Sequence, residues 1–91
     1  MSTIEKLKET IADIAQRRKN VSASEIDWVV DQLKQHGFDV RDPRKTRHGV
    51  LYGVGSVRFS ICTHHPGGKQ VKACYIDDFV DAMTELGLYE N

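Results

Sequence analysis

The sequence predicts an α+β two-layer sandwich, in which helices pack on an antiparallel sheet of three or four strands. Two observations lead to this prediction. Apolar residues recur at helical spacing near both ends of the chain, whereas apolar and polar residues alternate between positions 50 and 64. The dipeptide Gly55-Ser56 divides the alternating stretch, and a two-residue turn with glycine first is typical of a type II′ hairpin. The 91 residues suffice for one domain with a modest core.

An amphipathic helix is expected over residues 3–18. Its apolar stripe consists of Ile4, Leu7, Ile11 and Ile14, at spacings of three and four residues. Two uses of this stripe are consistent with the pattern. It packs on the body of the same domain, or it forms a seam with a second copy, which would make the protein a homodimer through its N-terminal helix.

A second helix is expected to begin at Ser22, because Ser22-Ala23-Ser24-Glu25 fits a capping box. Gly37 followed by Phe38 is typical of a Schellman stop at its other end. Trp28 lies off the apolar stripe of this helix. It either covers the junction with the first helix or offers a surface on which a base stacks.

Extended segments are expected at residues 38–41, 50–54 and 57–64. The stretch 70–75 is either a short fourth strand or the lead into a last helix. That helix is expected to have Asp77 and Asp78 near its N-terminus, where the helix dipole favours negative charge. These acids, with Asp81, cap and solvate the helix, or alternatively form a docking face for a basic partner.

Charge is unevenly distributed along the chain, although the formal net charge is zero. Residues 41–72 contain seven Lys and Arg residues and one acid, Asp42, so this segment carries about +6 and the remainder about −6. A basic centre of this kind attracts a phosphate-rich partner. No apolar run approaches the roughly 20 residues that span a bilayer, and no signal peptide is evident, so the cytoplasm is the expected location.

Several blocks of the chain resemble the HicA-type toxins of toxin–antitoxin systems. They are Asn20-Val21, Gln35-His36-Gly37-Phe38, the basic turn leading to His48, Gly67-Gly68-Lys69-Gln70-Val71-Lys72 and Glu85-Leu86-Gly87-Leu88. The resemblance covers roughly residues 20–90, which makes 20–91 a HicA-like domain and 1–19 a helical extension. It implies a double-stranded-RNA-binding-like fold and cleavage of mRNA, with a HicB-like antitoxin as the blocking partner.

The resemblance assigns the role of general base to His48. The family histidine usually follows Gly-Ser or Gly-Thr, whereas His48 follows Thr46-Arg47; matching Gly-Ser to Gly55-Ser56 instead would put Val57 in its place. An imidazole also suits the role chemically, because its ordinary pKa of about 6.5 lies close to neutrality. The residues expected to bind RNA are Arg44, Lys45, Arg47, Arg58, Lys69 and Lys72.

The same region contains residues that suit two other chemistries. His64 and His65 are alternative acid and base candidates, although a histidine pair before Pro-Gly-Gly is typical of a turn. With Cys62 and Cys74, both expected to be buried thiols, they are also zinc-ligand types, but their spacing matches no standard zinc pattern. No metal or cofactor is therefore expected. The alternative to a nuclease is a non-catalytic RNA-binding or protein-interaction module of the same fold.

Overall fold

The computed structural model describes residues 4–45, 49–62 and 69–90. Within these ranges the chain forms helices α1 (Ile4–Arg17), α2 (Ala23–Gln35) and α3 (Ala73–Glu85) and strands β1 (Arg44–Lys45), β2 (Val50–Val54) and β3 (Val57–Ile61). The strands make one antiparallel sheet in the order β1-β2-β3. The α+β prediction is confirmed at this level.

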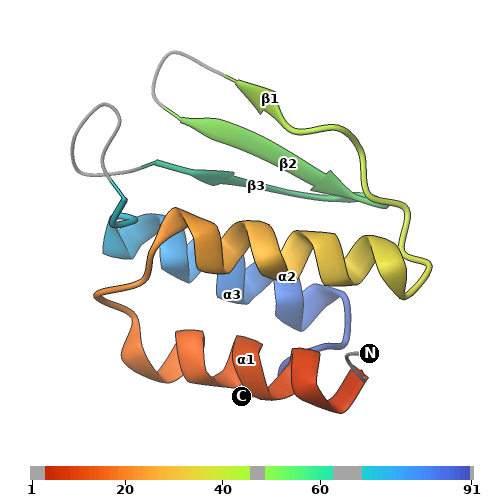
Figure 1. Cartoon of the computed structure of the whole chain (residues 1–91), viewed down its shortest axis with the longest axis horizontal. Helices are drawn as coiled ribbons and strands as arrows, with labels where there is room; N and C mark the ends of the chain where they lie inside the picture. Colours follow the sequence, from red (N-terminus) through yellow and green to blue (C-terminus); the bar gives the residue numbers. More distant parts are fainter. Residues whose placement is uncertain (1–3, 46–48, 63–68, 91) are drawn as a thin grey trace.

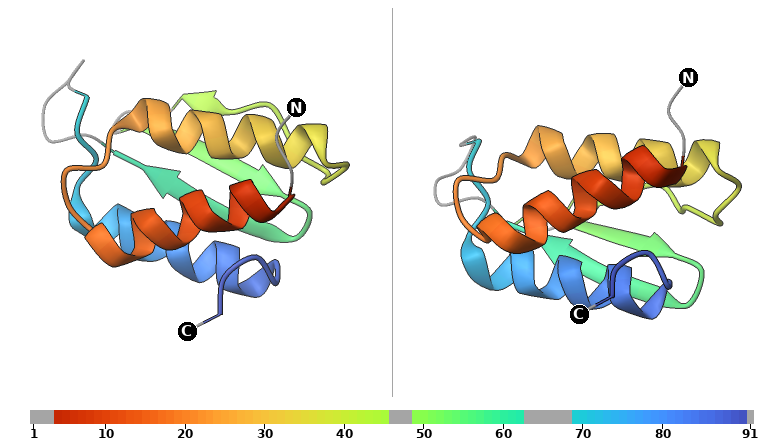
Figure 2. Two further views of the ribbon diagram at one scale, coloured as in Figure 1. Left: turned by 60° about the horizontal axis from the view of Figure 1, so that its bottom comes forward. Right: turned by 90° about the horizontal axis from the view of Figure 1, so that it is seen from below.

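The helices all lie on one side of the sheet. Helices α2 and α3 lie next to it, and α1 packs on them from the side that faces away from the strands (Figures 1 and 2). Three residues of the α1 stripe, Leu7, Ile11 and Ile14, are fully buried, whereas Ile4 at the start of the helix is 37% exposed. The stripe therefore packs within the domain, and the opposite face of the sheet is left without a covering helix (Figure 1).

The sheet contributes one face to the core. Its buried side chains are Tyr52, Val54, Val57, Phe59 and Ile61, at the alternating positions that the sequence predicts. The ring of Phe59 stacks on Tyr52, with centroids 5.3 Å apart, and forms a T-shaped pair with Phe79 on α3, with centroids 5.5 Å apart. The Tyr52 hydroxyl donates to the Asp27 carboxylate on α2. The hairpin and its inward face are thus fixed by aromatic contacts.

The expected capping box at the start of α2 is present. The Glu25 backbone N–H donates to the Ser22 hydroxyl, and the Ser22 backbone N–H donates to the Glu25 carboxylate at 2.8 Å. Arg17 of α1 also donates to this carboxylate, at 2.5 Å. Burial on its own raises the pKa of Glu25, but the hydrogen bonds from Arg17 and Ser22 outweigh it and hold the pKa below its ordinary value.

Removing this cap should cost stability in a pH-dependent way. Ser22→Ala should lower the free energy of unfolding by about 1 kcal/mol, because it removes a side-chain cap.

Because the pKa of Glu25 is lower in the folded state, Glu25 stabilises the fold above its unfolded pKa of about 4.3, and this stabilisation is lost as the pH falls through the folded value. Urea unfolding of Glu25→Gln should therefore depend less on pH below about 4.3 than the parent. Parallel pH profiles for the two proteins would contradict the assignment.

The prediction of a strand at residues 38–41 is wrong. Val40 makes only a single bridge, to Val54, and the edge strand β1 begins four residues after Val40, at Arg44, past Pro43. The Val40 N–H donates to Phe38 at 2.9 Å, so the backbone turns there and does not form a regular ladder. The predicted Gly37-Phe38 stop is confirmed, with the Phe38 N–H donating to Leu33 at 3.0 Å.

Helix α3 begins earlier than expected. Its N-cap is Lys72, so Asp77 and Asp78 lie beyond the first turn, which contains no acid. The residues before Lys72 form isolated bridges and no ladder: Gln70 bridges to Ser22, the Ala23 N–H donates to the Lys69 carbonyl at 2.7 Å, and the Val71 N–H donates to the Val21 carbonyl at 2.8 Å. The stretch before α3 is therefore a lead into the helix and not a fourth strand.

Candidate nucleic-acid interface

The open face of the sheet carries residues from all three strands. The register pairs Leu51 with Ser60 and Gly53 with Arg58. Residues opposite one another in an antiparallel pair share a face, and the alternate residues of both strands are buried toward the helices. These four residues therefore face outward. Arg44 of β1 pairs with Leu51 and lies on the same open face.

Arg41 reaches this face although it belongs to no strand. Its backbone N–H donates to the Gly53 carbonyl at 2.9 Å. A Cβ atom placed on Gly53 would lie 3.4 Å from Cδ of Arg41, so the aliphatic part of the Arg41 side chain crosses directly over this glycine. Gly53 thus lies between Arg41 on one side and Arg58 on the other.

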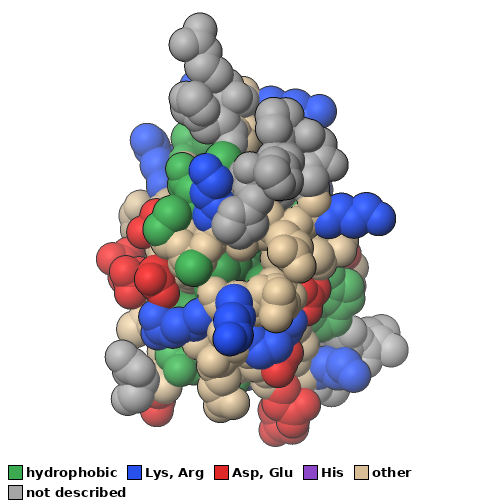
Figure 3. Space-filling model, turned by 90° about the vertical axis from the view of Figure 1, so that its left-hand side faces the viewer, with side chains coloured by type: hydrophobic (Ala, Val, Ile, Leu, Met, Phe, Trp, Pro, Cys, Tyr) green, Lys and Arg blue, Asp and Glu red, His purple; other side chains and the backbone are tan. Residues whose placement is uncertain are grey.

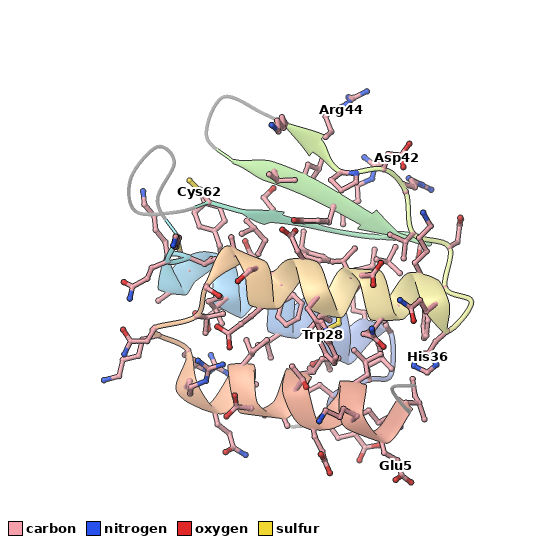
Figure 4. The ribbon with its side chains drawn as sticks, viewed as in Figure 1. Glu5, Trp28, His36, Asp42, Arg44 and Cys62 are labelled. Carbon is pink, nitrogen blue, oxygen red and sulfur yellow. The ribbon has the colours of Figure 1, made fainter. Side chains whose placement is uncertain are left out.

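These residues surround a hollow of about 250 Å³, which we call the arginine pocket. Its lining consists of Arg41, Asp42, Arg44, Leu51, Tyr52, Gly53 and Arg58. Figure 4 shows Asp42 and Arg44 at the side of the sheet that faces away from the helices. The pocket therefore combines three guanidinium groups with one carboxylate over a glycine floor.

The three arginines are available to a ligand. All three are exposed, and none of them takes part in an ion pair with another described residue. Arg17 and Arg18, by contrast, form ion pairs with Asp13, Glu25 and Asp77. None of the three guanidinium groups is neutralised by an ion pair with a described residue, which suits this face to bind an anion.

The described residues that were predicted to bind RNA lie in different parts of the structure. Arg44 and Arg58 meet in the arginine pocket, whereas Lys45 pairs with Val50 and so belongs to the other face of the sheet. Lys69 and Lys72 lie at the end of the sheet, where the Lys72 N–H donates to the Cys62 carbonyl at 3.0 Å. They therefore form a second basic group, separate from the pocket.

The predicted histidine chemistry lies outside the described residues. This applies to His48 and to Arg47 beside it, and equally to His64 and His65. The described residues that flank the first pair are Lys45 and Gly49, at the end of the sheet where β1 stops and β2 begins. Figure 3 looks onto this end of the molecule and shows Lys and Arg side chains around the residues that are not described.

The cysteines differ from the sequence prediction. Cys62 is only half-buried, and Cys74 is exposed because it lies in the first turn of α3 on the side away from the core. The prediction that both thiols are buried is therefore wrong. Across residues 4–45, 49–62 and 69–90, no group of three His, Cys, Asp or Glu side chains is placed to hold a metal ion.

Arg41 is the pocket residue that the sequence analysis did not single out. It counted toward the basic segment, but its place depends on the irregular backbone between α2 and β1 and on the absence of a side chain at Gly53. The sequence offers one weak signal, a glycine in the middle of a strand, which marks a close approach by another group.

No protein-family model, no curated protein and no solved structure matches this chain. None of the helices among the described residues is both long and apolar enough to cross a membrane.

Proposed function

We propose that this protein binds RNA through the open face of its sheet, with the arginine pocket on the sugar-phosphate backbone. The observation that carries the proposal is the convergence of Arg41, Arg44 and Arg58, all without ion-pair partners among the described residues, around the glycine floor. Guanidinium groups bind phosphate oxygens in a bidentate manner, and releasing counterions from phosphates supplies most sequence-independent affinity.

The shape of the surface supports the same function. Gly53 leaves a hollow between the arginines, and Leu51 beside it offers an apolar contact to a sugar or base. A positively charged groove that follows the backbone is typical of proteins that bind single strands. Lys69 and Lys72 provide a second basic group at the end of the sheet, outside the pocket.

The resemblance to HicA-type toxins extends the proposal to cleavage. In this mechanism His48 takes the proton of a ribose 2′-hydroxyl, and the 2′ oxygen attacks the adjacent phosphorus. The bond to the 5′ oxygen of the next nucleotide breaks, and that oxygen takes a proton from water. The products are a 2′,3′-cyclic phosphate and a 5′-hydroxyl end. Positive side chains offset the negative charge that develops on the phosphate oxygens. A HicB-like antitoxin would inhibit the protein by covering this basic surface.

Filling the arginine pocket without changing its charge tests the binding site. Gly53→Val should lower the affinity for a fluorescent single-stranded RNA about tenfold, which corresponds to about 1.4 kcal/mol, because the new side chain occupies the floor. The fold should persist, since valine favours a strand. Fluorescence anisotropy at fixed salt measures the affinity.

Ser60→Val is the matched control, because Ser60 faces the same side of the sheet but lies outside the pocket lining. It should bind RNA as the parent does. If Gly53→Val melts at the temperature of the parent and keeps full affinity, RNA does not use the pocket.

A further inference from the structure

Strand β3 has a free edge within the described sheet, because the strand order is β1-β2-β3. Val54 and Val57 flank the two-residue turn, so they exchange backbone hydrogen bonds, as do Tyr52 and Phe59 two residues further on. The intervening residues of β3, Arg58 and Ser60, therefore point their backbone N–H and C=O groups away from β2, toward the free edge.

A groove of about 410 Å³ lies along this edge, between β3 and α3, and we call it the edge groove. Its lining consists of Leu51, Val57, Arg58, Phe59, Ser60, Asp78, Asp81, Ala82 and Glu85. The strand edge forms one wall and α3 the other, with apolar groups between them. An unpaired strand edge beside such a groove is the geometry that accepts an added strand.

The wall formed by α3 is acidic. Asp78, Asp81 and Glu85 recur at spacings of three and four residues, so they lie on one face of the helix, and all three are exposed. None of them forms an ion pair with another described residue, in contrast to Asp77, which accepts a hydrogen bond from Arg18. Arg58 on the strand wall offsets one of these three charges, so the groove keeps a net negative charge for a partner.

We infer that the edge groove docks an extended peptide segment that carries Lys or Arg at alternating positions, and that this segment adds to the sheet as a strand beside β3. Its backbone pairs with the outward groups of Arg58 and Ser60. Every second side chain of an added strand points toward α3, at intervals of about 6.6 Å. The acids span about 10.5 Å along the helix, so two or three basic side chains of one strand reach them.

The chemistry of the groove disfavours two other occupants. The groove borders the arginine pocket, with which it shares Leu51 and Arg58, but its acidic wall repels the phosphates of a nucleic acid. Pairing of β3 with β3 of a second copy about a two-fold axis would bring two acidic walls close together, and like charges oppose that arrangement. A basic peptide satisfies both the strand edge and the acids.

A fluorescein-labelled peptide of alternating Lys and Thr residues is a suitable probe, titrated with the full chain and followed by anisotropy. Binding should saturate and should weaken at least tenfold in the variant Asp78→Asn/Asp81→Asn/Glu85→Gln. The matched control Glu5→Gln/Glu9→Gln/Glu90→Gln makes the same change in charge at exposed sites outside the groove and should bind as the parent does.

A second probe isolates the backbone contribution without altering the protein. The same peptide with N-methylated backbone amides keeps its charges but cannot pair with a strand, and it should bind at least tenfold more weakly. Equal binding of both peptides, equal loss in both triple variants or no saturable binding would overturn the proposal. A further outcome would also overturn it: the protein sediments as a dimer, its Arg58 and Ser60 amide NMR signals shift on dimerisation, and no peptide binds. The occupant of the groove would then be a second copy.

Discussion

The triple variant Arg41→Ala/Arg44→Ala/Arg58→Ala should bind single-stranded RNA on the order of 100-fold more weakly than the parent at 0.1 M salt. Each phosphate contact on a single strand contributes about 0.7 to the slope of log affinity against log salt, so three contacts contribute about 2. The variant should therefore also show a slope that is flatter by about 2. Fluorescence anisotropy across a range of salt concentrations measures both quantities.

Two controls separate this effect from general loss of charge. Lys8→Ala removes an exposed positive charge from α1, on the far side of the molecule, and should leave the salt slope unchanged. Arg58→Lys keeps the charge but loses the bidentate fork, so it should retain the slope and lose part of the affinity. If the triple variant binds with the slope of the parent, the open face makes no phosphate contacts.

His48→Ala should reduce RNA cleavage by about 10²–10⁴-fold while leaving RNA affinity nearly unchanged, because it removes a general base and no phosphate contact. The cleavage rate of a defined RNA under single-turnover conditions measures the first effect, and anisotropy measures the second. Induction without an antitoxin should arrest growth for the parent and not for the variant.

His36→Ala is the matched control for the cleavage experiment. His36 is exposed at the C-terminal end of α2, at the end of the molecule opposite Cys62 (Figure 4). The His36→Ala variant should cleave RNA like the parent. If the parent binds RNA but leaves it intact, the non-catalytic module is favoured. If His48→Ala still cleaves RNA, His64 and His65 become the candidates for the general base.

Local patterns predicted most of the regular structure. The capping box at Ser22, the Gly37-Phe38 stop and the Gly55-Ser56 hairpin each depend on a few neighbouring residues, and all three are confirmed. The alternation beyond the hairpin also identified the buried face of β3. Residues close in sequence carry enough information for such features, because the hydrogen bonds that define them are local.

Features that depend on distant contacts were missed. The edge strand formed at Arg44 and not at 38–41, since its position is set by pairing with β2 and by the turn at Val40. Adjacent basic residues were treated as one surface, but Arg44 and Lys45 belong to opposite faces of the sheet. The place of Arg41 over Gly53 depends on the same irregular backbone. A count of charges along the chain therefore found the basic region but not its geometry.

The most direct test of RNA binding by the open face is a map of the contact surface in solution. Amide signals of the ¹⁵N-labelled protein should be followed while a short single-stranded RNA is added at moderate salt. We expect the largest shifts at Arg41, Arg44, Leu51, Gly53 and Arg58, with little change along α1. Shifts confined to the helices, or none at RNA concentrations that saturate the anisotropy signal, would contradict the assignment of the open sheet face as the RNA-binding surface.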